Sequence, residues 1–140
     1  MRTIWSVVVG GAAGIVAMML VEFLVSLVVP APANLDITRP GASATYIESL
    51  PVLLLALQIV SWAIGSYVAA FVAMRMAKGT SILPGVVAGA VPLLAGVIDM
   101  ALIPHPIWMW VLGVTALTVP AYYAARMMLP KQASLRDAIG

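Results

Sequence analysis

The sequence predicts an all-α membrane protein built as a bundle of four transmembrane helices. Hydrophobic residues make up 64% of the 140 residues and charged residues only 9%, whereas a soluble domain carries about 25% charged residues. The apolar residues also gather in four long runs, each near the ~20 residues that cross a bilayer as a helix. The runs lack the alternation of barrel strands, and backbone groups in hydrocarbon must be satisfied within their own segment. Each run is therefore expected to be α-helical.

The four spans and their connections account for the whole chain, so residues 1–140 are expected to form a single integral membrane domain. The first run is longer than the apolar core of a signal peptide, and we expect it to remain as a span. The expected spans are 4–29, 51–74, 82–103 and 107–129, and the expected outer loop is 30–50.

The outer loop is the longest connection and contains a second helix signal. Thr45 and Glu48 have the spacing of a capping box, in which each side chain satisfies a backbone amide at the start of a helix. We therefore expect a short helix that begins between Pro40 and Thr45 and runs into the second span, with a kink at Pro51.

The basic residues predict the orientation of the chain. With four spans crossed, six of the seven basic residues fall on one side of the membrane, and only Arg39 falls on the other. Under the positive-inside rule, both termini are then cytoplasmic. The net charge of +2 is explained in this way and does not imply a nucleic-acid partner. The six are Arg2, Arg75, Lys78, Arg126, Lys131 and Arg136.

Classical catalysis has no support in the sequence. The absence of cysteine excludes disulfides, thiolate metal sites and cysteine nucleophiles. One histidine and scattered serines and threonines form no recognisable nucleophile arrangement, and no Gly-rich phosphate loop is present. Glu22, Asp99 and His105 are of metal-ligand type, but their spacing specifies no site. We therefore expect neither enzyme activity, nor a cofactor, nor a metal.

Polar residues inside the spans are the candidates for a functional site. At a rise of ~1.5 Å per residue, Glu22, Gln58 and Asp99 all lie in the outer third of the bilayer, with His105 just above them. A carboxylate at this depth needs a proton or a partner, and Arg39 in the outer loop is the possible counter-ion. Two interpretations are open: an outward-facing polar pocket for a proton, a cation or a small amphiphile, or polar contacts that only hold the helices together.

Two G-x-x-x-G pairs predict close helix packing, because two residues without side chains on one face let backbones approach. Gly10 and Gly14 lie in the first span, and Gly85 and Gly89 lie in the third. They are expected to pack these two spans within the bundle, and homodimerisation is the alternative.

The same two segments suggest an internal repeat. Each glycine pair is followed by an apolar stretch, an acid and Pro-x-Pro, so the chain could be a duplicated helical hairpin related by an axis along the membrane normal. The other explanation is that glycine, alanine and proline recur in any membrane helix.

Three segments carry a resemblance to a known group of proteins: Pro30-Ala-Pro32 after the first span, Leu50-Pro51 before the second, and Ile103-Pro-His-Pro-Ile-Trp108 before the fourth. This pattern resembles small uncharacterised bacterial four-helix inner-membrane proteins. The resemblance implies the architecture and the membrane, and it implies no activity. The chain also resembles the small multidrug resistance exporters in having a single acidic residue, Glu22, in the first of four helices. Those exporters lack the long first outer loop, and their Glu lies nearer mid-membrane.

The sequence thus favours a non-enzymatic multi-pass membrane protein. It would be an accessory or structural protein, or one that associates with itself, with the lipid bilayer and a homo-oligomer or a larger membrane complex as its partners. The alternative is a small proton- or cation-coupled transporter that works through the outward-facing polar pocket. Transport would require an oligomer, because four helices barely enclose a cavity.

Overall fold

The computed structural model describes residues 1–30, 32, 36, 38–39, 41–78 and 81–139, without the side chains of 130–137 and 139. Throughout this part of the chain, every regular element is a helix. Four of the helices are long and apolar enough to cross a membrane, which confirms the predicted four-helix membrane bundle. The helices are α1 (Arg2–Val28), α2 (Ala42–Ser49), α3 (Val52–Ala77), α4 (Leu83–Leu102) and α5 (Ile107–Ile139).

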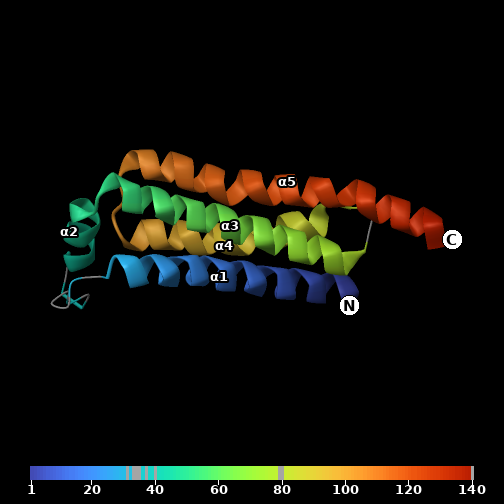
Figure 1. The fold of residues 1–140 in the computed structure, drawn as a ribbon, viewed down its shortest axis with the longest axis horizontal. Coiled ribbons are helices and arrows are strands. Elements are labelled where there is room, and N and C mark those ends of the chain that lie inside the picture. The colour runs from blue at the N-terminus through green and yellow to red at the C-terminus, as the bar shows by residue number, and fades with distance from the viewer. Residues whose placement is uncertain (31, 33–35, 37, 40, 79–80, 140) are drawn as a thin grey trace.

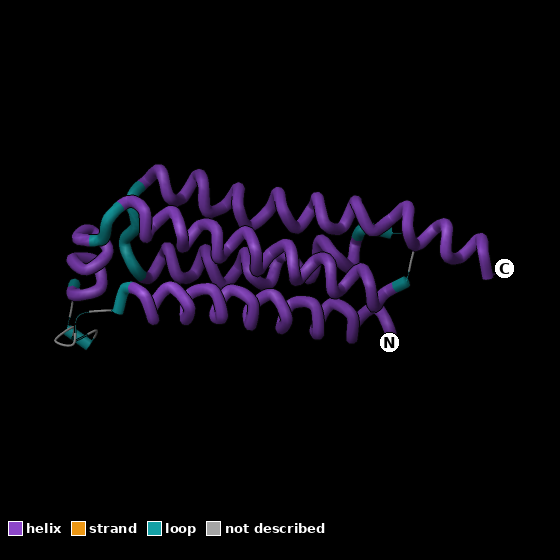
Figure 2. The backbone as a smooth tube through the Cα atoms, viewed as in Figure 1, coloured by secondary structure: helices purple, strands orange, loops and turns teal. Residues whose placement is uncertain are grey.

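The four long helices lie side by side, and the short α2 lies across one end of the bundle (Figure 1). Both chain ends lie at the opposite end of the bundle, as four membrane crossings require. The backbone trace in Figure 2 shows the same arrangement, with the loops confined to the two ends. α3 and α4 each contact all three of the other long helices, whereas α1 and α5 make no contact within the described residues. α3 and α4 therefore form the short diagonal of the bundle.

The fourth span ends where the sequence predicts, but its helix does not. The apolar span covers Ile107–Leu129, whereas α5 continues to Ile139 and extends beyond the other helices (Figure 1). Pro130 removes one backbone donor, which leaves the carbonyl of Arg126 without its helical partner. At the membrane surface water can satisfy that carbonyl, so the helix can continue.

The structure corrects the prediction for the outer loop. α2 does not run into the second span, because Leu50 is extended (ψ 138) and Pro51 caps a new helix. A residue before proline is driven out of the helical region by the proline ring. The predicted capping box is also absent. α2 is capped by Gly41 in the left-handed conformation (φ 79), and the Thr45 hydroxyl donates to the Gly41 carbonyl inside the helix.

The first glycine pair packs α1 against α3. A Cβ added at Gly10 would lie 2.7 Å from the Cβ of Ala73, and one added at Gly14 would lie 2.6 Å from the Cβ of Ala69. Such distances leave no room for any side chain, so the two backbones are in direct contact. The main partner of this pair is thus α3, the second span. The third span, α4, also reaches Gly14, since a Cβ added there would lie 3.1 Å from the ring of Pro92.

The second glycine pair packs α4 against α5 in the same way. A Cβ at Gly85 would lie 2.8 Å from the Cβ of Ala125, and one at Gly89 would lie 2.6 Å from the Cβ of Ala121. Each hairpin therefore sets a G-x-x-x-G pair antiparallel to an A-x-x-x-A pair, which agrees with the repeat suggested by the sequence. All four glycines are buried within the chain, so these pairs cannot serve as a homodimer surface.

The core towards the α2 end is filled by large side chains around Trp62, which is 1% exposed. A hydroxyl also crosses between helices here, because Ser66 donates to the carbonyl of Ala116 at 3.0 Å. The bundle axis is therefore packed at this level. The other buried members of this cluster are Met18, Leu55, Met100, Met109 and Leu117.

Candidate functional site

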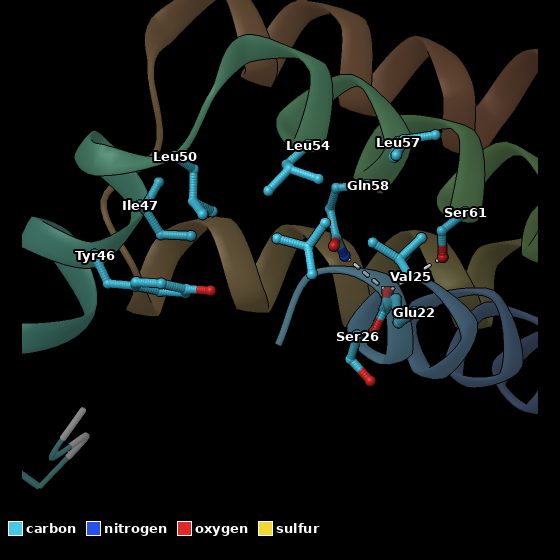
Figure 3. A pocket seen from close by; sticks show the side chains of 11 residues that line it. Glu22, Val25, Ser26, Tyr46, Ile47, Leu50, Leu54, Leu57, Gln58 and Ser61 are labelled. Carbon is cyan, nitrogen blue, oxygen red and sulfur yellow. Dashed lines mark hydrogen bonds between the residues drawn. The ribbon is translucent and has the colours of Figure 1, made fainter. Parts of the chain in front are cut away.

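A cavity of about 220 Å³ lies between α1, α2 and α3 at the α2 end of the bundle. Figure 3 shows it from close by, with Tyr46 at one extreme and Glu22 and Ser61 at the other. Hereafter it is called the Glu22 pocket. Its lining combines six aliphatic residues with five polar ones, namely Glu22, Val25, Ser26, Val29, Tyr46, Ile47, Leu50, Leu54, Leu57, Gln58 and Ser61.

Glu22 is the charged residue of the pocket, and two residues of α3 hold its carboxyl group. Gln58 donates from Nε2 to Oε1 of Glu22 at 2.7 Å, and the hydroxyl of Ser61 lies 3.2 Å from the same oxygen. Glu22 follows the buried Met18 by four positions, so both lie on the face of α1 that meets α3. Gln58 and Ser61 are three positions apart and share one face of α3.

Two acceptor atoms of this cluster remain available to a ligand. Oε2 of Glu22 accepts no hydrogen bond from any described residue, since both donors are directed to Oε1. Gln58 uses its amide nitrogen for Glu22, and Figure 3 shows its oxygen turned toward the pocket. The polar end of the pocket therefore presents acceptors, one on a carboxyl group and one on an amide.

Ser61 is shared between two acceptors. Its hydroxyl lies 3.2 Å from Oε1 of Glu22 and also 3.2 Å from the backbone carbonyl of Met18. A hydroxyl has one proton to donate, so it can serve one of these oxygens at a time. The bond can therefore move from Glu22 to Met18 without breaking the contact between α1 and α3.

The apolar end of the pocket is formed by α2 and the loop that follows it. Tyr46 and Ile47 reach the pocket from α2, and Leu50 reaches it from the link to α3 (Figure 3). Ile47 and Leu50 also pack against the core cluster around Trp62. These contacts hold α2 across the end of the bundle, so that it covers the pocket.

Asp99 and His105 form a second polar site, and neither lines the Glu22 pocket. Oδ2 of Asp99 lies 4.0 Å from Nε2 of His105. The Asp99 side chain is 44% exposed, whereas that of His105 is 3% exposed and lies against Trp62 with the ring centres 6.4 Å apart. Both residues thus lie where α4 turns into α5, outside the Glu22 pocket.

The backbone determines which nitrogen of His105 carries a proton. Nδ1 lies 2.6 Å from the carbonyl oxygen of Ile103. A carbonyl can only accept, so Nδ1 must be the donor, and Nε2 is left facing Asp99. His105 is therefore a buried structural residue of the turn, in agreement with the interpretation that polar side chains here hold the bundle together.

Arg39, the possible counter-ion, is exposed, and it forms no ion pair with either acid within the described part of the chain. The loop that contains Arg39 also contains Asp36, whose carboxylate accepts two hydrogen bonds. The hydroxyl and the backbone amide of Thr38 both donate to Asp36, and these bonds hold the pKa of Asp36 below its usual range. No group of three potential metal ligands occurs among the described residues.

The sequence-predicted site is thus divided in two by the structure. Glu22 and Gln58 come together in one pocket, while Asp99 and His105 meet elsewhere. Sequence reasoning missed Ser61, although its position one turn after Gln58 on a polar stripe was the available signal. It also missed Tyr46 and Ile47, for which no local pattern exists, since their role depends on where α2 folds.

No family model matches this chain, no curated protein matches it, and no solved structure matches it.

Proposed function

We propose that this chain is a non-enzymatic membrane protein that acts by binding a small molecule in the Glu22 pocket, as an accessory protein of the membrane. One observation carries the proposal: a cavity at the α2 end of the bundle places a carboxyl group, one oxygen of which bonds to no described residue, beside aliphatic walls. Concave apolar sites with a few convergent polar groups are the usual form of ligand pockets. A purely structural contact between Glu22 and Gln58 would need no cavity next to it.

Native mass spectrometry of the protein extracted from its own membrane tests this proposal. We expect a small molecule to remain bound to the wild type and to Asp99→Asn, which changes the acid outside the pocket. It should be lost from Leu54→Trp, which fills the pocket from its wall. Retention of the same molecule by Leu54→Trp, in protein with normal helix content, would contradict the proposal.

The location proposed is a bacterial inner membrane with both termini in the cytoplasm. The positions of Arg75 at the end of α3 and of both termini support this orientation, because all lie at the same end of the bundle. Arg126 near the same end is held by its bond to the Tyr122 hydroxyl at 2.9 Å. Under the positive-inside rule that end faces the cytoplasm, and the Glu22 pocket then faces outward.

A proton- or cation-coupled transporter is the second candidate, and the shared hydroxyl of Ser61 is the observation that favours it. When Glu22 gains a proton, Ser61 can donate to Met18 instead. The packed bundle axis argues that any transport path would run between copies, in a homo-oligomer or a larger complex. Vesicles containing the protein would be loaded with a pH-sensitive dye. Proton flux above that of Glu22→Gln vesicles would support transport, and equal flux would exclude it.

A further inference from the structure

We infer that the ligand of the Glu22 pocket is a primary ammonium group carried on a short apolar chain. This inference rests on the proposed binding function and names the chemical class of the ligand. Three features of the pocket carry it: its charge, the kind of hydrogen-bonding atoms it leaves free, and its size and walls.

The charge of the pocket selects a cation. Glu22 carries the sole carboxyl group among the lining residues, and none of them is Lys, Arg or His. Within the described residues no cation contacts its carboxyl group, and Arg39 is exposed in the loop. A positively charged ligand would thus meet a carboxylate in a low-dielectric site, where attraction between opposite charges is stronger than in water.

The free hydrogen-bonding atoms select an N–H donor over a quaternary cation. Oε2 of Glu22 and the amide oxygen of Gln58 both accept, and neither is used by a described residue. A primary ammonium has three donors in one compact group, whereas a quaternary ammonium has none. Buried acceptors that meet no donor are costly, so the geometry discriminates between cations of the same charge.

The walls and the volume select a short apolar chain. From the polar end, where Val25 lies beside Glu22, the pocket continues past Leu54 of α3 toward Ile47 of α2 (Figure 3). Its volume of about 220 Å³ is below the ~300–1,000 Å³ of pockets for drug-sized molecules. An alkyl chain of a few carbons therefore fits, with its ammonium group at Glu22 and its tail under α2.

Isothermal titration calorimetry on the purified full-length protein in detergent tests this inference with four hexyl probes. They share one tail and differ in the head group: hexylammonium, hexyltrimethylammonium, hexanol and hexanoate. We expect hexylammonium to bind at least tenfold more tightly than each of the others. Glu22→Gln should reduce its affinity to that of hexanol, because the charge is lost while an acceptor for Gln58 and Ser61 is kept.

Asp99→Asn is the matched control, since it removes the acid that does not line the pocket, and hexylammonium affinity should be unchanged. Helix content and elution volume show that each variant is folded. Equal affinities for the four probes, or unchanged hexylammonium binding by Glu22→Gln, would overturn the inference. Tight binding of hexanol or hexanoate that Leu54→Trp abolishes would also overturn it, yet would leave the proposed binding function standing.

Two sources supply a primary ammonium group on methylene carbons: a free amine, and the head group of an ethanolamine phospholipid, in which a phosphate follows two methylene groups. Repeating the titration in nanodiscs with and without phosphatidylethanolamine separates these sources. Weaker hexylammonium binding in the presence of that lipid supports a lipid head group as the occupant. Unchanged binding supports a free amine. Failure of hexylammonium to bind in both kinds of nanodisc would overturn the inference.

Discussion

Gln58 donates its side-chain amide to Oε1 of Glu22 at 2.7 Å, across the interface between α3 and α1. The contact joins two helices and also fixes the direction of both side chains. It leaves the amide oxygen of Gln58 turned toward the pocket (Figure 3) and the second oxygen of Glu22 without a donor among the described residues. The contact between the helices and the candidate binding site therefore depend on the same pair of residues.

The first prediction concerns this pair. Gln58→Leu removes the shorter of the two hydrogen bonds to Glu22 and leaves Ser61 as the remaining donor. We expect the free energy of unfolding to fall by about 1–3 kcal/mol, the cost of an unmet polar partner. Thermal unfolding in detergent measures it. Ser26→Ala is the control, because that hydroxyl lines the pocket but, among the described residues, bonds only to the carbonyl of Phe23. Equal melting temperatures for the two variants would contradict the prediction.

The second prediction concerns the glycine contacts. In Gly14→Ala the new Cβ would lie 2.6 Å from the carbonyl oxygen of Gly65, so α1 must move away from α3. Overpacking of this kind costs about 1–3 kcal/mol, and the melting temperature in detergent should fall.

Ala12→Leu is the matched control for the glycine prediction, because Ala12 is exposed on the other side of α1. This larger substitution should leave the melting temperature near that of the wild type. If Ala12→Leu were the more damaging change, the face of α1 assigned to α3 would be wrong.

The third prediction compares the two members of the second polar site. His105→Phe keeps a ring against Trp62 but removes the donor to the carbonyl of Ile103, so about 1–3 kcal/mol of stability should be lost. Asp99→Asn should cost less than ~1 kcal/mol, because the contact is long, at 4.0 Å, and the side chain is 44% exposed. Chemical unfolding curves give both values. A larger loss for Asp99→Asn would show that the contact between Asp99 and His105, and not the hydrogen bond of His105 to Ile103, stabilises this turn.

The fold could be predicted from the sequence because a helix in lipid needs little more than length and apolar composition. The predicted spans therefore agree with the observed helices to within a few residues. Because the number of spans is even, both termini lie at the same end of the bundle. The separation of α2 from α3 depends on one residue, Leu50, whose extended backbone is set by Pro51. The proline pointed to a kink, but the structure shows a full break and a new direction.

The site could be predicted only in part, because depth along a helix follows from counting residues whereas rotation about its axis does not. Depth correctly placed Glu22 and Gln58 at one level. It also placed Asp99 there, but the rotation of α4 is set by close contacts such as Gly96 against Leu117. That rotation turns Asp99 to the α4–α5 turn and away from the Glu22 pocket.

The last prediction concerns orientation, which decides whether the Glu22 pocket faces the cell exterior. The chain has no cysteine, so single cysteines can be introduced as reporters without background. Glu48→Cys lies on α2 and Ser81→Cys lies in the connection before α4; both positions are exposed and they lie at opposite ends of the bundle. A membrane-impermeant maleimide added to intact cells should label Glu48→Cys, and Ser81→Cys only after the membrane is opened. Both variants should react equally in detergent, which controls for local reactivity. Labelling of Ser81→Cys in intact cells, with Glu48→Cys protected, would invert the topology and place the pocket on the cytoplasmic side.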